Sequence, residues 1–308
     1  MIKKKLTKKK KLTKKVDYMS INASLIKELR AMTGSGMMDC KEALVENKGD
    51  IEESVTWLRK KGLSSVQKKA DRAANEGVVA VYLNGKDATM VEVNSETDFV
   101  GKNEKFLSLV NIIVESAHNF KGNSVEDFLK DGVSSDGKSI QELISENIAV
   151  IGENIVLGKL SKLHVDSGEI IAYLHNKLSD NIGKVGVLVG IEGEFNDKVS
   201  EIATNIAMHI AATKPASLTK EDLDQKILDN EKAIFIEQAK QSGKPDAVIE
   251  KMVKGRIQKF INESVLLEQN FVMDGKTKIC DVVKNAEKET GCKFQISGFS
   301  RISIEAPQ

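Results

Sequence analysis

The strongest constraint on the fold is a pattern that the chain contains twice: two short β-branched runs followed by a helix with one apolar face. In the first copy the runs cover residues 78–83 and 89–93, and the Asn84-Gly85 dipeptide between them is typical of a hairpin turn. In the second copy they cover residues 170–174 and 185–191. The helices that follow carry apolar side chains at helical spacing, at Phe106, Val110, Ile113 and Ala117 and at Val199, Ile202, Ile206 and Ile210. The repeat predicts two similar α+β subdomains, each an antiparallel sheet covered by a helix.

The segment after the second copy has the pattern of two helices. Their apolar positions are Leu223, Ile227, Ile234 and Ala239, and then Ile249, Met252, Val253, Ile257 and Phe260. Gly243 as a helix end and Pro245 in a first helical turn predict a tight connection between them. An antiparallel helical hairpin is therefore expected as an insertion. An alternating run at residues 299–304 then adds a strand to the second sheet.

Three short helices are predicted before the first copy. Their apolar positions are Leu25, Ile26, Leu29 and Met32, then Met37, Cys40 and Leu44, and finally Ile51, Val55 and Leu58. Asn22 can cap the first helix and Gly34 can end it, while Asp50 followed by Glu53 resembles a capping box. The three helices are expected to form a small bundle. Residues 68–76 then connect the bundle to the next segment as a helix or linker.

Charge is distributed unevenly along the chain. Residues 1–18 contain nine lysines and one acidic residue, Asp17, whereas the rest has 37 basic and 44 acidic residues. An acidic body argues against general nucleic-acid binding, which depends on neutralising phosphates. We expect the tail to be disordered and dispensable, and the alternative interpretation is contact with RNA or an acidic surface through its lysines.

The sequence contains no signature of a membrane span or of catalysis. No run approaches the ~20 apolar residues of a membrane span, and the lysine-rich start lacks the apolar core of a secretory signal. Cys40, Cys280 and Cys292 form no CxxC pair, which fits a reducing cytoplasm. The four histidines lack ligand spacing, so no metal, cofactor or catalytic residue is predicted.

One motif favours a different class of protein. The run from Gly132 to Ser139 (GVSSDGKS) fits the phosphate-binding P-loop pattern G-x-x-x-x-G-K-[ST]. A P-loop needs a buried strand before the glycine loop and a helix after it. A helix can follow through residues 140–148, but residues 125–131 are acidic and helix-like. A polar loop before a helix is therefore the preferred interpretation.

Two short segments are candidates for recognition. Thr97-Asp98-Phe99-Val100 lies between a predicted strand and a predicted helix. Considered alone, Asp98 is a turn or cap residue and Phe99 packs onto the helix as a staple. The Met37-Met38 pair is assigned to the bundle core by the same reasoning, although methionine-rich surfaces also suit adaptable binding.

Six motifs from Ser20 to Glu305 resemble those of the elongation factor Ts family, in family order. They begin at Thr33 (TGSGMMDCKEAL), Asn94 (NSETDFV), Ile151 (IGEN), Met208 (MHIAA), Gln241 (QSGKP) and Gln269 (QNFVM). One short match would be weak, whereas six in order are specific. The lysine-rich tail lies outside the family pattern.

The resemblance implies an α+β fold that agrees with the predicted elements. Its parts are an N-terminal three-helix ubiquitin-associated-like domain, a core of two antiparallel α+β subdomains, and an inserted antiparallel helical hairpin that forms a coiled coil. The expected ranges are 1–18 for the tail, 19–72 for the helical domain, 73–166 and 167–308 for the core subdomains, and about 217–262 for the hairpin.

The resemblance also implies guanine-nucleotide exchange on elongation factor Tu during protein synthesis. Asp98 and Phe99 would reach into the GTPase domain of that partner and disturb its magnesium and phosphate site. Further contacts are implied for Arg30, Met37, Met38 and Lys41 of the helical domain and for Ile151, His175, Val272 and Met273 of the core. The protein would be a non-enzymatic cytoplasmic factor without cofactor, bound nucleotide or membrane contact. The alternatives are a P-loop nucleotide hydrolase and a ubiquitin-associated-like adaptor without exchange activity.

Overall fold

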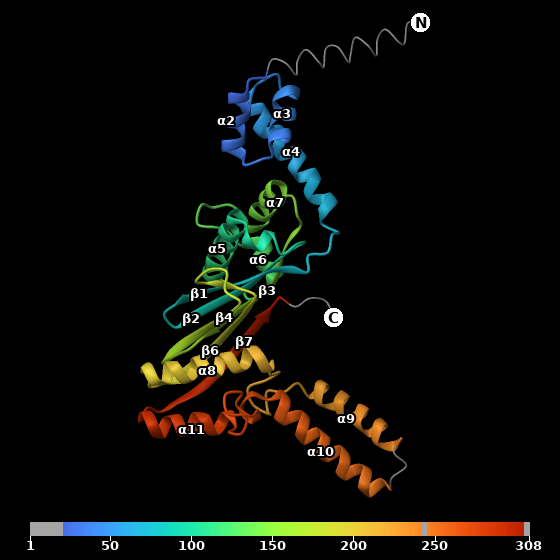
Figure 1. The fold of residues 1–308 in the computed structure, drawn as a ribbon, viewed down its shortest axis with the longest axis vertical. Coiled ribbons are helices and arrows are strands. Elements are labelled where there is room, and N and C mark those ends of the chain that lie inside the picture. The colour runs from blue at the N-terminus through green and yellow to red at the C-terminus, as the bar shows by residue number, and fades with distance from the viewer. Residues whose placement is uncertain (1–20, 242–244, 305–308) are drawn as a thin grey trace.

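A computed structural model describes residues 21–241 and 245–304, which form ten α-helices and two antiparallel β-sheets. The molecule is elongated, with a helical bundle at one end and the helices α9 (Gln225–Lys240) and α10 (Asp246–Ser264) at the other (Figure 1). The lysine-rich tail and the predicted helix end at Gly243 lie outside the described residues. Among the described helices, none has the length and hydropathy needed to cross a membrane.

The bundle consists of α2 (Ala23–Thr33), α3 (Met37–Glu46) and the first half of α4 (Ile51–Lys69). The predicted caps are confirmed: the Asn22 side chain caps α2, Gly34 ends it with φ 68°, and Asp50 accepts the N–H of Glu53 at 2.8 Å. The buried side chains at its centre are Leu29, Cys40, Ala43, Leu44 and Leu58.

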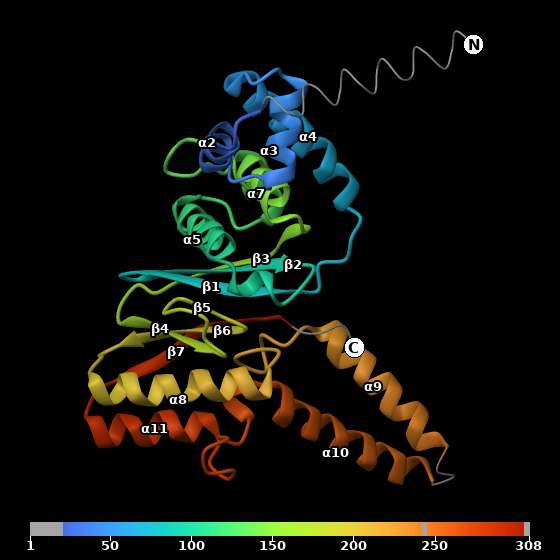
Figure 2. The same cartoon turned by 45° about the horizontal axis from the view of Figure 1, so that its top comes forward.

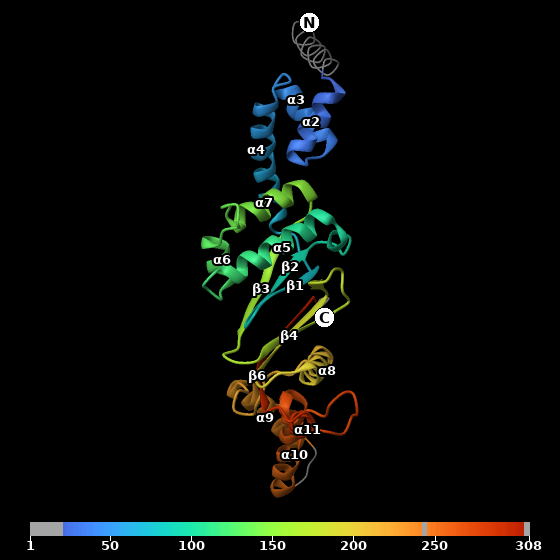
Figure 3. The ribbon, with the colours of Figure 1, turned by 90° about the vertical axis from the view of Figure 1, so that its left-hand side faces the viewer.

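Helix α4 is longer than predicted and belongs to both the bundle and the core. It runs for 19 residues, and its second half crosses α7 (Ile140–Ile151), as Figure 3 shows. A Cβ atom on Gly62 would lie 2.9 Å from the Cβ of Ala149, so the two helices approach as closely as a glycine allows. Val66 packs against the core. One continuous helix therefore connects the bundle to the rest of the molecule.

The first sheet has the strand order β3-β2-β1-β5. Its strands are β1 (Glu76–Asn84), β2 (Asp87–Ser95), β3 (Ile155–His164) and β5 (Ile182–Gly183). The predicted hairpin is confirmed in β1 and β2, where Asn84 pairs with Asp87 across a two-residue turn. Gly85 in that turn has φ 61°, the left-handed conformation that favours glycine. β3 and β5 are not predicted from the sequence.

The second sheet has the order β4-β6-β7, with β4 (Glu169–His175), β6 (Val185–Gly193) and β7 (Phe294–Ser303). The closing strand β7 pairs with β6 as predicted, although it begins at Phe294 rather than at Phe299. Helices α8 (Asp197–Thr213) and α11 (Ile279–Thr290) pack against its outer face. Of these, α8 is predicted and α11 is not.

The core has four layers: helices, first sheet, second sheet and helices again (Figure 2). The outer helices α5 (Glu104–Asn119), α6 (Val125–Asp131) and α7 cover the first sheet over one apolar cluster, and α8 and α11 cover the second sheet over another. A third cluster fills the space between the sheets, with Val79 and Met90 from the first and Leu174 and Leu188 from the second. The two repeats therefore share a buried interface.

Helices α9 and α10 form the predicted hairpin, but the predicted apolar stripe of α9 is wrong. Ile227 and Ile234 are exposed, whereas Ala239 is buried against Ile249 and Val253 of α10. At 3.6 residues per turn, Ile234 and Ala239 differ by about 140° around the helix, so they lie on different faces. The buried face instead passes through Phe235 and Ala239.

Candidate functional site

The loop between β2 and α5 is anchored by Glu153, which follows α7. One carboxylate oxygen of Glu153 accepts the backbone N–H of Thr97 at 2.9 Å and the other accepts its hydroxyl at 2.7 Å. The Ser95 hydroxyl donates to the Thr97 carbonyl oxygen at 2.9 Å. Because hydrogen bonds to a charged acceptor are stronger than neutral ones, Thr97 is the fixed point of this loop.

A second carboxylate fixes the residue before Thr97. Glu96 accepts the N–H of Asn154 at 2.6 Å and pairs with Arg72 at 3.3 Å. The Asn154 amide donates to the carbonyl oxygen of Arg72 at 2.8 Å. The exit from α4, the end of β2 and the end of α7 therefore meet at this point, although they are far apart in the sequence.

Beyond these anchors, Asp98 and Phe99 face the solvent. The Phe99 side chain is 81% exposed, so its predicted role as a staple on α5 is wrong. Val100, which begins the one-turn helix η1 (Val100–Lys102), is buried and packs into the first core cluster. With anchored residues on both sides, the chain holds a large apolar side chain in water.

Ile151 and Gly152 end α7 beside this loop. Gly152 has φ 92°, and this left-handed residue turns the chain so that Glu153 and Asn154 face β2. Ile151 is half-buried and packs against the first core cluster. A contact role for Ile151 stays a prediction, and its motif has a structural role that is visible here.

The methionine pair lies on the surface of the bundle. Met37 is 57% and Met38 71% exposed, so assigning them to the bundle core is wrong, and Met37 does not share the buried stripe of Cys40 and Leu44. The turn that precedes them is fixed, because the Thr33 hydroxyl donates to the Leu29 carbonyl oxygen at 2.7 Å and accepts the N–H of Ser35 at 3.3 Å. The other predicted contacts here are Arg30, which is exposed, and Lys41, which is half-buried.

His175 is the exposed last residue of β4. Its carbonyl oxygen accepts the N–H of Lys184 at 3.0 Å, and the Lys184 ammonium pairs with Glu76 at 3.2 Å. Glu76 begins β1 opposite Ser95, the last residue of β2. The structure therefore places His175 at the same end of the core as the Asp98–Phe99 loop.

Val272 and Met273 are exposed at the tip of a loop that precedes α11. Asp274 accepts the N–H groups of Lys276 at 2.8 Å and of Thr277 at 3.0 Å within this loop. The hydrogen bonds from Thr277 and Lys276 lower the pKa of the Asp274 carboxyl. The loop is therefore internally braced, and it is separate from the Phe99 loop.

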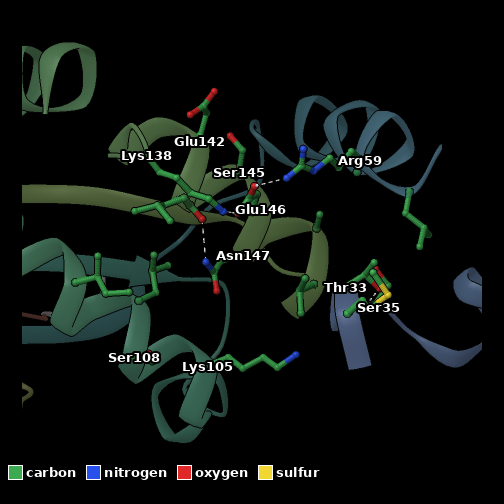
Figure 4. Close-up of a pocket in the computed structure, with 18 of the residues that line it drawn as sticks. Thr33, Ser35, Arg59, Lys105, Ser108, Lys138, Glu142, Ser145, Glu146 and Asn147 are labelled. Atoms are coloured by element: carbon green, nitrogen blue, oxygen red, sulfur yellow. Dashed lines mark hydrogen bonds and ion pairs between the residues drawn. The ribbon is translucent and has the colours of Figure 1, made fainter. Parts of the chain in front are cut away.

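The predicted site residues thus occupy three surfaces. One is on the bundle, with Arg30, Met37, Met38 and Lys41; one is at the end of the core, with Asp98, Phe99, Ile151 and His175; and one is the loop of Val272 and Met273. A cleft of about 1010 Å³ separates the bundle from α5 and α7 beside the α4–α7 crossing (Figure 4). The crossing of α4 and α7 therefore connects the surface on the bundle to the surface at the end of the core.

The P-loop-like segment has no geometry for holding phosphate. It follows the helix α6 rather than a strand, and the N–H groups of Gly132, Ser134 and Gly137 donate to carbonyl oxygens within or beside the loop. Lys138 pairs with Glu146 at 2.8 Å in the cleft of Figure 4. These groups are therefore engaged in local structure.

The polar residues that hold the loops of Phe99 and Val272 were not predicted as site residues. They are Glu96, Glu153, Asn154, His209 and Gln269. All five lie inside the motifs that carry the family resemblance. These motifs were the feature of the sequence from which the five residues could have been identified. Among the residues that the structure describes, no group of three His, Cys, Asp or Glu side chains is placed to hold a metal. The three surfaces present apolar and charged side chains on backbone that neighbouring hydrogen bonds hold in place.

Comparison with known proteins identifies the family. The family model described as "Elongation factor TS" matches residues 96–306. Elongation factor Ts of Rickettsia bellii (strain OSU 85-389) is 47% identical over 287 residues, 92% of each chain. Elongation factor Ts of Bartonella bacilliformis (strain ATCC 35685 / KC583 / Herrer 020/F12,63) is also 47% identical over 287 residues, 93% of each chain. A match of this extent shows that the chain belongs to the elongation factor Ts family of translation elongation factors.

Proposed function

We propose that this translation elongation factor is a guanine-nucleotide exchange factor, which binds elongation factor Tu and promotes release of GDP. The observation that carries the proposal is the anchored loop with Phe99 exposed at its tip. An apolar side chain held in water costs free energy in the free protein, and burial in a partner recovers it.

The mechanism is thermodynamic linkage, and no bond is made or broken. A protein that binds the nucleotide-free form of its partner better than the GDP form must lower the affinity for GDP by the same factor. In this mechanism Phe99 enters the GTPase domain as an apolar wedge. Asp98 brings a negative charge close to the groups that hold magnesium and phosphate.

The other surfaces hold the wedge in place. Arg30, Met37, Met38 and Lys41 contact the GTPase domain from the bundle, and Ile151, His175, Val272 and Met273 extend the contact along the core. A single side chain contributes only ~1.5–3 kcal/mol when fully buried, so the additional area is needed to compete with bound GDP. The protein needs no cofactor or nucleotide of its own for this role.

We also propose the domain division that the family resemblance implies. Residues 19–72 would be the ubiquitin-associated-like domain, 73–166 and 167–308 the two core subdomains, and about 217–262 a coiled-coil hairpin. Its antiparallel helices, with Ala239 packed on Ile249 and Val253, support the last assignment. A role in translation places the protein in the cytoplasm.

The direct test is release of fluorescent GDP from elongation factor Tu, with and without this protein. Catalytic amounts should accelerate release, and Asp98→Ala should reduce the acceleration. A protein that binds elongation factor Tu and leaves GDP release unchanged would instead be an adaptor. Lys138→Ala serves as a control, because it alters the P-loop-like segment: unchanged exchange by this variant fits the proposal, whereas saturable nucleotide binding lost in it would favour a hydrolase.

A further inference from the structure

We propose that His209, as a neutral imidazole with its proton on Nε2, is a positioning residue for the Val272–Met273 loop. The inference rests on the proposed function, in which this loop contacts elongation factor Tu. His209 lies on α8 and is fully buried, so it does not reach a partner itself. It acts through the backbone of Val272, whose N–H donates to Nδ1 of His209 at 3.2 Å.

The tautomer of His209 is fixed from both sides. A backbone N–H can only donate, so Nδ1 must carry a lone pair. On the other side, Nε2 lies 2.8 Å from Oε1 of Gln269. The amide group of Gln269 donates through its nitrogen to the Glu263 carbonyl oxygen at 2.6 Å, which turns its oxygen toward the imidazole. Nε2 must therefore carry the proton.

Gln269 is itself held in place, so the imidazole has little freedom. Gln269 is buried, and its backbone N–H donates to the Val265 carbonyl oxygen at 3.1 Å. Its backbone carbonyl oxygen accepts the N–H of Ile279 at 3.0 Å. The Thr213 hydroxyl lies 3.0 Å from the same Oε1. A chain of buried and partly buried hydrogen bonds thus leads from the end of α10 to the tip of an exposed loop.

The surroundings of the ring favour its neutral form. The described groups that bond to the ring or lie against it are uncharged, namely the Gln269 amide, the Val272 N–H and the tilted Phe271 ring at 5.9 Å between centroids. Glu263 contributes only its carbonyl oxygen here, since its carboxylate pairs with Lys259. Burial lowers the pKa of His209. Protonation would place two donors face to face at Nδ1 and Val272, and the loop would lose its support.

A purely structural histidine and a positioning histidine give different results in two matched variants. In His209→Asn the side-chain amide can place its oxygen near the position of Nδ1 and still accept the Val272 N–H. In His209→Gln the amide can place its nitrogen near the position of Nε2 and still donate to Gln269, but the acceptor for Val272 is lost. Gln retains more of the buried volume, so a structural role predicts that His209→Gln is the milder change. Positioning predicts the reverse for binding: His209→Gln weakens the affinity for nucleotide-free elongation factor Tu about 3- to 10-fold, the effect of one hydrogen bond, and His209→Asn less.

The experiment measures the affinity of the full chain for nucleotide-free elongation factor Tu and the amide hydrogen exchange of Val272 in the free protein. In His209→Gln the Val272 amide should exchange faster, and Met273→Ala should cost less affinity than it does in the wild-type background, because the loop is already released. Wild-type exchange at Val272 in a folded His209→Gln variant would overturn the inference. Equal loss of affinity from Met273→Ala in both backgrounds would do the same.

Nitrogen NMR shifts of the wild-type imidazole provide a test that needs no variant. They should show protonated Nε2 and unprotonated Nδ1, and the affinity for elongation factor Tu should fall only below the ordinary histidine pKa of 6.5. A proton on Nδ1 at neutral pH would refute the proposal even if no variant folds. If Met273→Ala leaves the wild-type affinity unchanged, the contact role in the proposed function fails, while the Val272 exchange still decides whether His209 holds the loop.

Discussion

Replacing Phe99 by alanine should separate exchange activity from stability. The side chain is 81% exposed, so about a fifth of its surface is buried in the free protein. Full burial of a phenylalanine stabilises by ~1.5–3 kcal/mol, and the loss of a fifth of that is about 0.3–0.6 kcal/mol. Phe106 provides the matched control, because it is fully buried under the first sheet. Phe106→Ala should cost about 3–5 kcal/mol through the cavity that it leaves.

The same arithmetic sets the expected effect on the partner. If elongation factor Tu buries the remaining four-fifths, Phe99→Ala loses about 1.2–2.4 kcal/mol of contact, or roughly 8- to 60-fold. A wedge acts most strongly in the state in which GDP is leaving. Exchange should therefore slow more than binding to nucleotide-free elongation factor Tu weakens, since the contacts of the bundle and of Val272–Met273 are retained.

Three measurements on one preparation decide the matter: thermal unfolding, affinity for nucleotide-free elongation factor Tu, and the rate of GDP release. The expected variant melts near the wild-type temperature, binds its partner and exchanges poorly. A fall in melting temperature comparable to that of Phe106→Ala would show that Phe99 supports the fold. Normal GDP release by a stable Phe99→Ala variant would refute the wedge.

Three further changes test the supports of the site. Glu153→Ala removes the acceptors of both the N–H and the hydroxyl of Thr97, so Thr97 amide exchange should accelerate and GDP release should slow roughly tenfold; an unchanged amide exchange rate at Thr97 would contradict the anchor. Gly62→Val should force α4 from α7 and increase the radius of gyration in X-ray scattering with loss of exchange, and an unchanged radius would show that the crossing adapts. Glu268 and Lys278 flank the loop of Val272 and Met273 and pair at 2.7 Å. Hydrogen bonds from Lys278 and Lys220 lower the pKa of Glu268, so its contribution to stability is present at neutral pH and is lost as the pH falls below 4.5. Glu268→Gln should thus lower stability by up to about 1 kcal/mol at pH 7 and by nothing in acid, as urea unfolding at both pH values can check.

Local sequence patterns predicted much of the fold, because many of its helices and strands are determined by residues that are close together in the sequence. The β1–β2 hairpin follows from its turn residues, and α5 and α8 follow from apolar faces that pack on a sheet. β3 is an edge strand whose side chains are mostly exposed or half-exposed, so its alternation of apolar and polar residues is weak. β5 has only two residues, and its pairing with β1 depends on the packing of one repeat on the other. The apolar positions of α11 do follow helical spacing, at Ile279, Val283 and Ala286, but the residue before it is Lys278, which makes no side-chain cap hydrogen bond.

Motif resemblance could select candidate site residues, but local sequence could not predict which of them are exposed. Motif resemblance selects Phe99, whereas the chemistry of its neighbours favours a buried staple. The exposed position depends on Glu153 and Asn154, whose partners Thr97 and Glu96 are 56 and 58 residues away in the sequence. No local pattern contains that information. The same holds for Val272, whose N–H is accepted by a histidine 63 residues earlier.

The two loops with exposed apolar tips follow one physical rule. In each, an exposed apolar side chain lies at the tip, and the adjacent backbone is held by a polar residue from a distant segment, Glu153 for Phe99 and His209 for Val272. A flexible loop would lose conformational entropy on binding, at about 1–2 kcal/mol for each residue ordered, which could cancel the gain from burying one side chain. Because the loops are ordered before the partner arrives, most of that gain is retained for binding. The anchors are therefore expected to affect affinity as strongly as the tips do, although they touch only this chain.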